Sequence, residues 1–451
     1  MDEQNPLLQE ILEALKKEDT SALRTFLDEI HPYDLAQALL QLEEDDRMLF
    51  QKLTDEELAD VIEELDHEEQ QSLLEKMGPT RGLRIIEKMA PDDAADYLGE
   101  LNEEAQTEII QQLSPAFAAD VEHLLGYPDN TAGGIMTTEY FVLHAQDTAQ
   151  QAIEQLRQLA PDAETAYYLY VVDKSHQLIG VVSIRQLITA PRETPVEDIM
   201  SERVVSVPVD MDQEEVARTM SNYGFLAVPV VKEGLMVGVI TIDDAMEVLE
   251  EEASEDMMKF GGISGADAGM QDLNVGVLKS AMGRIPWLVL LLGVGIMSGN
   301  IIAVFEDTLS AVVVLAVFIP MIADMAGNTG TQSLAIVVRG LTMGQFKGKD
   351  VWKMIRREAK VGVMIGLTNG ILIALITTLW QGNPVLGFVI GLSLTITLFF
   401  STLAGATVPL IMAKLNIDPA VASGPFITTI NDIIGLTIYF TVATAFMEYL
   451  V

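Results

Sequence analysis

The chain has 451 residues, of which 49% are hydrophobic, and its 67 acidic and 27 basic side chains give a net charge of −40. Residues 285–451 contain eight acids and eight bases, so the whole negative excess lies on residues 1–284. Such a surface repels itself and excludes nucleic acid as a partner, whereas divalent cations relieve the repulsion. Solubility alone is the alternative explanation of this charge.

The composition excludes several other kinds of site. The chain has no cysteine, which rules out disulfides and thiolate metal sites, and its five histidines form no ligand-spaced cluster. The start, MDEQNPLLQEILEAL, lacks a basic region followed by an apolar run, so we expect no secretory signal and a cytosolic N-terminal half. No nucleophile–base pair, Walker loop or zinc motif appears, which predicts that the chain is neither an enzyme nor an ATP-driven pump.

Residues 31–113 contain a short repeat that closes each time on an apolar residue. Successive closing residues are 11 or 12 positions apart: Leu42, Leu53, Leu65, Met77, Met89, Leu101 and Leu113. Phrases such as TDEELADVIEEL begin with a Thr or Asp that can cap a helix. Short helices of this kind stack into a superhelix in which each unit buries a face on the next. We therefore predict an acidic helical domain over residues 1–130.

A second repeat covers residues 135–253. Ile135-Met136-Thr137 returns as Ile199-Met200-Ser201, and LIGVVSI at 178–184 returns as MVGVITI at 236–242. Each unit reads strand, helix, strand, strand, helix. The pattern resembles a tandem pair of CBS domains, an α+β regulatory module that often binds adenine nucleotides. The pair would occupy residues 131–253, divided at about 198.

The CBS resemblance leaves ATP binding open. The Ser/Thr-x-x-Asp motif, whose acid usually holds a ribose in that family, is intact in the second unit as Thr241 to Asp244. In the first unit it runs from Ser183 to Gln186, with Gln in place of Asp. This difference weakens the case for a ribose at the first site.

A segment rich in acids follows the CBS pair. The sequence LEEEASEDMMKF predicts a helix, the glycines at 261, 262 and 265 predict a break, and a further helix should lead to the membrane. We assign residues 254–284 to this connecting helix. It either carries movement to the membrane part or serves as a passive linker.

Residues 285–451 contain five apolar segments. Ile285–Phe305 has 21 uncharged residues, enough to cross a bilayer core of about 30 Å. Thr308–Val338 is the second. The charge-free stretch between Lys360 and Lys414 breaks at Gln381–Pro384 into the third and fourth, and Pro419–Met447 is the fifth.

The basic residues between these segments predict the orientation. Every loop that contains Lys or Arg falls on the side of the N-terminal domain, whereas the loops at 306–307 and 381–384 contain neither. The positive-inside rule then places the N-terminus in the cytosol and the C-terminus outside. We expect a multi-pass protein of the bacterial cell membrane, surrounded by lipid.

Asp432 is the only charged residue between Asp418 and Glu448. A carboxylate at membrane depth costs about 2.5–3.5 kcal/mol on insertion scales and usually marks an ion path. Small and polar residues in the second, fourth and fifth spans either pack the helices closely or line the same path. For Asp324, an interfacial position or a helix–helix hydrogen bond is preferred over a role in the path.

Over its whole length the chain resembles the MgtE family of magnesium channels. The resemblance rests on the domain order, on the segment from Pro320 through Gly327 to Ser333, and on Ser423–Gly435. It implies a multidomain fold: a superhelical α-helical N-terminal domain, tandem CBS domains, a connecting helix, and a membrane domain of five helices over 285–451. It also implies a homodimer with one pore on the twofold axis, built chiefly from the second and fifth spans.

The resemblance further implies two sets of Mg²⁺-binding residues. In the pore, Asp432 and Thr428 would hold a hydrated ion, in agreement with the reluctance of magnesium to lose its waters. A regulatory set would bind internal Mg²⁺ and close the pore: Asp60, Asp92, Asp96, Glu214, Asp244, Glu252, Glu255, Asp256 and Asp418. Gly224 stands where the family can have an acid, which would remove one ligand.

Two other functions remain open at the level of the sequence. A broader divalent-cation transporter, for cobalt or manganese, would have the same architecture. A membrane-anchored nucleotide sensor would need no carboxylate within a span, so Asp432 argues against it.

Overall fold

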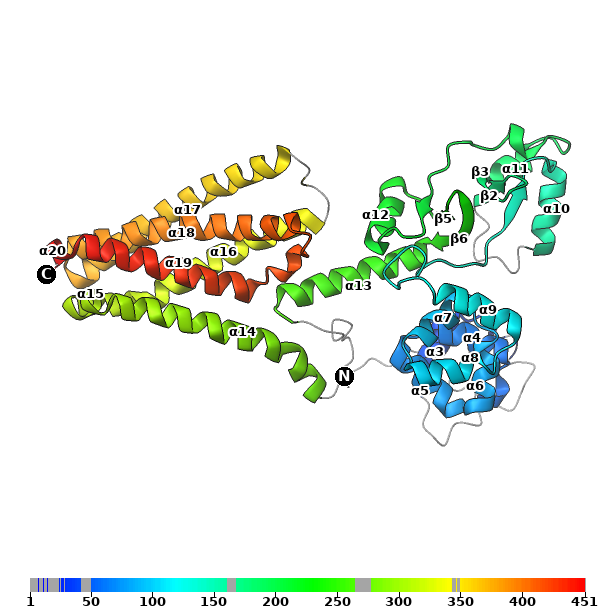
Figure 1. Cartoon of the computed structure of the whole chain (residues 1–451), viewed down its shortest axis with the longest axis horizontal. Coiled ribbons are helices and arrows are strands. Elements are labelled where there is room, and N and C mark those ends of the chain that lie inside the picture. The colour runs from blue at the N-terminus through cyan, green and yellow to red at the C-terminus, as the bar shows by residue number, and fades with distance from the viewer. Residues whose placement is uncertain are drawn as a thin grey trace. The chain divides into compact units, whose positions relative to one another are not determined.

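The structure is a computed structural model of the chain (Figure 1). It describes residues 29–41, 50–159, 168–263, 277–342 and 349–450, with isolated positions between 7 and 27 and residue 346. The chain divides into an N-terminal unit, residues 1–249, and a membrane unit, residues 250–451. Leu42 of the predicted repeat and Gly265 of the predicted break lie outside the described residues.

The N-terminal unit begins with a stack of short helices. They are α3 (Pro32–Leu40), α4 (Asp55–Glu63), α5 (His67–Met77), α6 (Pro79–Ile86), α7 (Pro91–Gly99), α8 (Glu103–Ile110) and α9 (Pro115–Leu124). Thr54 and Asp66 cap α4 and α5 by accepting hydrogen bonds from backbone N–H groups, and a proline opens α3, α6, α7 and α9. The predicted helical repeat is confirmed, with one short helix in each unit from Thr54 to Leu113.

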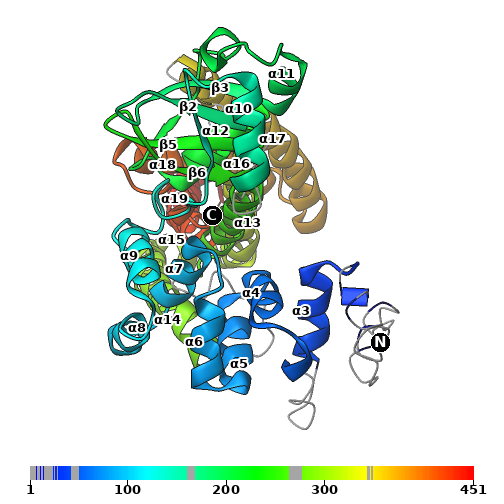
Figure 2. The same ribbon diagram turned by 90° about the vertical axis from the view of Figure 1, so that its right-hand side faces the viewer.

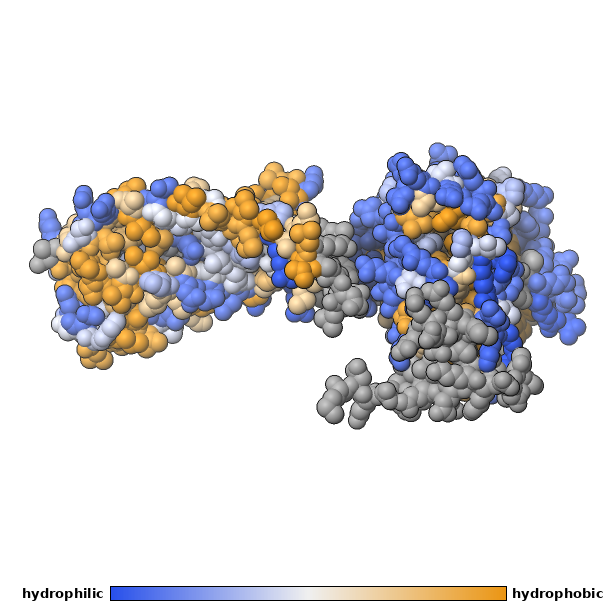
Figure 3. Space-filling model, turned by 90° about the horizontal axis from the view of Figure 1, so that it is seen from below, coloured by the Kyte–Doolittle hydropathy of each residue, from blue (hydrophilic) through white to orange (hydrophobic). Residues whose placement is uncertain are grey.

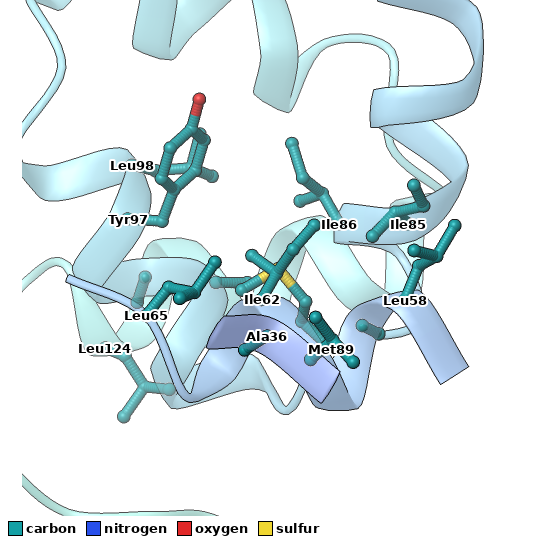
Figure 4. Close-up of a cluster of buried hydrophobic side chains, with 14 of the residues drawn as sticks. Ala36, Leu58, Ile62, Leu65, Ile85, Ile86, Met89, Tyr97, Leu98 and Leu124 are labelled. Carbon is teal, nitrogen blue, oxygen red and sulfur yellow. The ribbon is translucent and has the colours of Figure 1, made fainter. Parts of the chain in front are cut away.

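The apolar faces of these helices meet in one core (Figure 4). Leu58, Ile62, Ile85 and Leu98 are fully buried there. Burying a side chain of this size contributes roughly 1.5–3 kcal/mol. Isolated helices shorter than about 12 residues are marginal in water, so this packing, rather than local propensity, stabilises the stack.

The CBS module follows as two units of the same composition. The first contains β1 (Val142–His144), α10 (Ala149–Leu159), β2 (Tyr168–Val172), β3 (Leu178–Ser183) and α11 (Ile184–Thr189). After η3 (Val196–Asp198), the second contains β4 (Val207–Pro208), α12 (Gln213–Tyr223), β5 (Ala227–Lys232), β6 (Leu235–Thr241) and α13 (Ile242–Phe260). Each sheet has three strands, with a parallel pair followed by an antiparallel pair. The predicted order of strands and helices is confirmed.

The two CBS units exchange their leading segments. Thr137 forms a bridge with Val239 of β6, and Ser201 forms the equivalent bridge with Val181 of β3. Figure 2 shows the two sheets beside one another in the same unit as the helical stack. The repeated Ile-Met-Thr/Ser motif of the sequence is therefore the segment by which each unit pairs with the sheet of the other unit.

One helix, α13, belongs to both the second CBS unit and the connecting segment. It runs without interruption through residue 253, where the sequence analysis divided these two parts, and ends at Phe260. The predicted break follows at once, because Gly262 has φ +75°, in the region that favours glycine. The next described helix, α14, begins at Val277.

The membrane unit contains the five predicted membrane-spanning helices. Its elements are α14 (Val277–Val304), α15 (Glu306–Ala311), η5 (Val313–Phe318), α16 (Ile319–Thr342), α17 (Lys349–Gln381), α18 (Pro384–Lys414), η6 (Pro419–Val421), α19 (Gly424–Ala445) and α20 (Met447–Leu450). Five segments of the described chain are long and apolar enough to cross a membrane. The second is not the single helix expected over Thr308–Val338: the chain leaves the helical conformation at Val312, and Pro320 opens α16.

The central helix of this unit is α18. Within its most apolar stretch 61% of residues are buried, whereas the corresponding stretch of α14 buries none. Helices α16, α17 and α19 pack against α18 along their length (Figure 1). Close approach depends on small residues, since a Cβ added to Gly405 would overlap the carbonyl oxygen of Gly330.

Candidate ion path and cation site

Helix α16 carries an exposed polar face within the membrane unit. Asp324, Asn328 and Gln332 are four residues apart, so they share one face of the helix, and all three are exposed. Figure 3 shows the apolar surface of this unit interrupted by pale and blue patches. Hydrocarbon offers such side chains no hydrogen-bond partner. The face must therefore meet water or another protein surface.

Asp432 and Thr428 lie one turn apart on α19, and both are half-buried. Thr428 packs on α16, where a Cβ added to Gly327 would lie 2.7 Å from its methyl carbon. The Thr428 hydroxyl donates to the Gly424 carbonyl oxygen at 2.9 Å. The carboxylates of Asp432 and Asp324 interact electrostatically. Asp324 and Asp432 thus belong to the same polar side of α16 and α19.

The last turn of α13 contacts the ends of these two helices. The ammonium nitrogen of Lys259 lies 2.7 Å from Oδ2 of Asp418 and 2.8 Å from Oε1 of Glu255. Burial opposes its charge, but the hydrogen bonds to Asp418 and Glu255 raise the pKa of Lys259. Phe260 packs in a cluster with Ala420 and Ile427, next to the start of α19. Two predicted regulatory acids therefore converge, and a lysine lies between them.

Three other predicted regulatory acids come together in the N-terminal unit. Asp92 and Asp96 are on α7, Asp244 is in the first turn of α13, and both Asp92 and Asp244 act on the charge of Asp96. The Thr137 hydroxyl donates to Oδ1 of Asp92 at 3.0 Å. Thr241 donates to Oδ2 of Asp244 from its hydroxyl at 2.7 Å and from its N–H at 3.1 Å. Helix α7 thus meets the CBS module at a set of carboxylates, which we call the α7–α13 acidic cluster.

A residue that the sequence analysis did not select, Asp93, completes this cluster. Burial, and then repulsion by Asp92, raises the pKa of Asp93 to about 9. The same two causes raise the pKa of Asp96 to about 8.

The charged neighbours of the cluster are acidic as well. Glu63 acts on Asp93, and Glu247 and Asp129 act on Asp96. Burial also raises the pKa of Asp244, against the hydrogen bonds from Thr241. Nothing in the sequence pattern distinguished these neighbours, because they come from three separate segments of the chain. Their convergence favours a proton or a cation at this place.

The donor set fits a hard, hydrated cation. Among the described residues, no group of three or more His, Asp or Glu side chains is placed to hold a metal ion directly. Mg²⁺ usually keeps several waters and is held by one or two carboxylates, whereas zinc prefers His and Cys in a closed shell. An open cluster of carboxylates therefore suits a hydrated divalent ion of the magnesium type.

The other predicted acids of the N-terminal unit lie apart from this cluster. The charged neighbours of Asp60, on α4, are Glu57 and Glu56 of the same helix. Glu214, on α12, forms an ion pair with Arg218. Glu252 and Asp256 are on the part of α13 that belongs to the membrane unit. Within the N-terminal unit, the predicted regulatory set is therefore more than one site.

Two departures from the family pattern have structural explanations. Gly224 ends α12 with φ +66°, so an acid at this position would strain the backbone. The Ser/Thr-x-x-Asp motif caps a helix in both CBS units. Ser183 and Gln186 form a capping box at α11, and Gln186 thus preserves the hydrogen bonds that Asp244 makes with Thr241.

The fold and the polar side of α16 and α19 together define a membrane protein that transports cations and carries a CBS module. Residues 319–442 match the family model MgtE, described as divalent cation transporter. Residues 30–130 match the MgtE intracellular N domain, and residues 132–193 and 196–251 match CBS domains. The chain belongs to the MgtE family.

Relatives of the chain are named as transporters. It is 43% identical over 429 residues to "Magnesium transporter MgtE" of Bacillus subtilis, covering 95% of this chain and 94% of that protein. The crystal structure of the soluble part of a magnesium transporter is similar, with a TM-score of 0.53, 36% identity, and coverage of 56% of this chain and 100% of that one. A second solved structure, the cytosolic domain of the Mg²⁺ channel MgtE in complex with ATP, is 41% identical to this chain. The match covers 53% of this chain and 99% of that structure, with a TM-score of 0.49.

Proposed function

We propose that the chain is a magnesium-selective channel whose pore is closed by Mg²⁺ at its acidic N-terminal part. The observation that carries the proposal is the position of Asp432, beside Asp324, on the polar side of α16 and α19. A single membrane unit leaves this side exposed. A homodimer with the two faces opposed would shield them from lipid and enclose a hydrated path between two copies of Asp432.

The open geometry favours magnesium as the ion. A ring of carboxylates that holds the ion through its water shell suits a cation that dehydrates reluctantly. Thr428, one turn from Asp432, would offer a further oxygen at the same level. The basic loops predict that the N-terminal unit lies in the cytosol, where the ion would arrive after permeation.

The regulatory part of the proposal rests on the α7–α13 acidic cluster. Without a cation, the carboxylates of Asp92, Asp93, Asp96 and Asp244 repel one another, which favours separation of α7 from the CBS module. A bound Mg²⁺ would offset this repulsion and select the closed arrangement, because a ligand shifts an equilibrium only by its difference in affinity for the two states. Asp60, Glu214, Glu252, Glu255, Asp256 and Asp418 remain proposed ligands of further regulatory ions.

Helix α13 provides the route to the pore. Its first turn holds Asp244, and its last turn places Lys259 and Phe260 against the residues that precede α19. We infer that a change at the cluster alters the contact of this last turn with the pore helices. ATP binding at the CBS pair is a further proposal, supported by the module itself and by the motif from Thr241 to Asp244.

Recording from the purified protein in a lipid bilayer, while Mg²⁺ on the N-terminal side is varied, tests ion, direction and gating together. We expect a Mg²⁺ current that falls as this Mg²⁺ rises, and at least a tenfold smaller current in Asp432→Asn, since about 1.4 kcal/mol of lost stabilisation is already a factor of 10. Asp350→Asn, which removes an exposed acid bonded to Lys353 in the same unit, is the control and should conduct normally.

The same recordings decide against the alternatives. A normal, selective current in Asp432→Asn would contradict the pore assignment. Equal or larger currents with Co²⁺ or Mn²⁺ would instead show a broader divalent-cation transporter. A current that is insensitive to Mg²⁺ on the N-terminal side would leave the pore in place but remove the regulatory proposal.

A further inference from the structure

The interior of the membrane unit contains a group of buried polar side chains away from the exposed face of α16. We call it the α18–α19 seam and define it as Thr397 and Ser401 of α18 and Asn431 of α19. All three residues are fully buried. The hydroxyls of Thr397 and Ser401 and both polar atoms of the Asn431 amide have no hydrogen-bond partner in the described part of the chain.

The two hydroxyls differ from their neighbours on the same helix. Ser393, Thr395 and Thr402 of α18 each donate to the carbonyl oxygen four residues earlier, at 2.7 or 2.8 Å. This bond to the helix's own backbone is the usual way in which a buried hydroxyl is satisfied in such a helix. Thr397 and Ser401 do not make it. Their hydroxyls are therefore available to a group outside α18.

The packing of α18 on α19 brings the three side chains of the seam together. The methyl carbon of Thr397 lies 3.1 Å from the position that a Cβ on Gly435 would take. Successive spans run in opposite directions, so one turn forward on α18, from Thr397 to Ser401, corresponds to one turn back on α19, from Gly435 to Asn431. Ser401 thus faces Asn431.

Two glycines, Gly330 and Gly405, allow the helices to approach closely around the Asn431 amide. A Cβ added to Gly330 of α16 would overlap the amide nitrogen of Asn431, and one added to Gly405 of α18 would overlap the Gly330 carbonyl oxygen. Three helices therefore meet at the level of Asn431. The side chain fills the space that Gly330 leaves, and it is fully buried.

These groups match the hydrogen-bonding capacity of buried water. Polar groups buried without a partner are strongly disfavoured, and a buried water typically makes about three hydrogen bonds to such groups. An amide and two hydroxyls supply both donors and acceptors. None of the three side chains is charged, so the seam suits a neutral ligand and not a second cation.

We propose that the α18–α19 seam binds ordered water and that this water positions α19. Asp432 follows Asn431 directly, so holding the Asn431 amide against α16 and α18 holds the direction in which Asp432 points. Asn431 is then a positioning residue, and this second consequence rests on the proposed function of Asp432. The water site itself does not depend on that function.

A high-resolution map of the whole protein in a lipid nanodisc tests the site directly. We expect density for water within hydrogen-bond distance of the Asn431 amide and of the Ser401 or Thr397 hydroxyl. A map in which these atoms bond directly to protein groups, or in which the space between them is empty, overturns the proposal.

A thermal-unfolding cycle tests whether the seam residues share a ligand. Ser401→Ala should lower the midpoint by several degrees in the wild-type protein and by much less in Asn431→Leu, because the cost of leaving a group unpaired falls when its partner has been removed as well. Thr402→Val is the matched control: its hydroxyl bonds to its own helix, so its effect should be the same in both backgrounds. Equal effects of Ser401→Ala in both backgrounds contradict shared water. If Asn431→Leu does not fold, Thr397→Val provides the second background.

The positioning role has its own measurement. The double variant Thr397→Val, Ser401→Ala keeps the size of the side chains, and we expect it to lower the ratio of Mg²⁺ to Ca²⁺ current severalfold, whereas Thr402→Val should not. An unchanged ratio removes the positioning role. If Asp432→Asn conducts normally, the pore assignment fails, while the map and the unfolding cycle still decide the water site.

Discussion

Three carboxylates of the α7–α13 acidic cluster, those of Asp93, Asp96 and Asp244, are unusual because each of them holds a proton more tightly than an ordinary aspartate. Burial and the neighbouring acids raise the pKa of Asp93 to about 9 and that of Asp96 to about 8. The folded cluster therefore binds more protons than the unfolded chain between roughly pH 4 and pH 9. Stability from these groups is fully present below about pH 4 and is lost as the pH rises through 8 to 9.

This linkage predicts that Mg²⁺ and protons compete for the cluster. Carboxylates must lose their protons to bind the ion, so binding should release protons and the affinity should rise from pH 6 to pH 9. Calorimetry of the full-length protein in two buffers of different ionisation enthalpy measures the number released. Asp93→Asn should reduce that number, and Glu104→Gln, an exposed acid on α8, should not. Mg²⁺ binding without proton release would contradict a regulatory ion at this cluster.

At the level of single residues, the sequence distinguishes a side chain only where its chemistry is rare among its neighbours. Asp432 is conspicuous because it is alone in an apolar span. Asp93 is one acid among many, and only the fold shows that it lies among Asp92, Glu63 and Asp244. Asn431 carries no charge and was treated as part of a polar stretch. Whether its amide is satisfied depends on three helices meeting at Gly330, which no local pattern reveals.

Among the elements, α13 contains both Asp244 of the α7–α13 acidic cluster and Lys259, which pairs with Asp418 before α19. Its last turn is held by Lys259, which bonds to Asp418 before α19 and to Glu255 on its own helix. In the proposed function this lysine occupies a place between acids assigned to a regulatory ion. It already neutralises them in part, and so it holds the end of α13 against the pore helices without a metal.

We predict that Lys259→Gln changes gating while leaving the selectivity of the open pore unchanged. Loss of the ammonium removes the contact that holds α13 without a metal, so more Mg²⁺ should be required to hold this helix in place. It also leaves Asp418 and Glu255 to bind Mg²⁺, so the change in current between low and high Mg²⁺ should be larger. Dose–response curves for closure, recorded beside Lys353→Gln as a lysine control in the same unit, provide the comparison. Identical curves for Lys259→Gln and the wild type would show that the Lys259 contact has no part in gating.

The sequence predicted most elements correctly, and the exceptions have local causes. The repeats predicted the short helices and both CBS sheets, because each repeated phrase contains its own cap or turn. The second span was expected as one helix, yet the Val312–Val314 run interrupts it and Pro320 starts it again. The boundary at residue 253 separates two domains in sequence but falls inside α13, since no residue there ends a helix.

At the scale of the whole molecule, charge is distributed unevenly along the chain. Residues 285–451 are neutral overall, with few carboxylates, whereas residues 1–284 carry the entire excess of −40. Self-repulsion of this size makes the arrangement of the N-terminal part sensitive to divalent cations. That sensitivity could be predicted from composition, but the place where it acts could not.

Removal of residues 1–130 tests whether the helical stack responds to Mg²⁺ while the membrane helices conduct it. The deletion removes Asp92, Asp93 and Asp96 but no membrane helix, so we expect a conducting protein that Mg²⁺ closes poorly. Because the helical stack shares its core with the second CBS unit, the double variant Asp92→Asn, Asp96→Asn serves as a milder version. Closure at wild-type Mg²⁺ concentrations in both proteins would exclude the helical stack as a sensor.

Thr137 lies where the helical stack meets the CBS module. Thr137 is buried, and its backbone pairs with Val239 of the second sheet. Its hydroxyl donates a hydrogen bond to Asp92. Lifting α7 away would break this hydrogen bond together with the other contacts of the interface, so in the proposed function we expect the interface to separate as a whole and not by degrees. Several Mg²⁺ ions bound across such an interface would then act together. We therefore expect closure to follow Mg²⁺ concentration more steeply than binding of a single ion allows, which would make the protein a threshold detector instead of a proportional one.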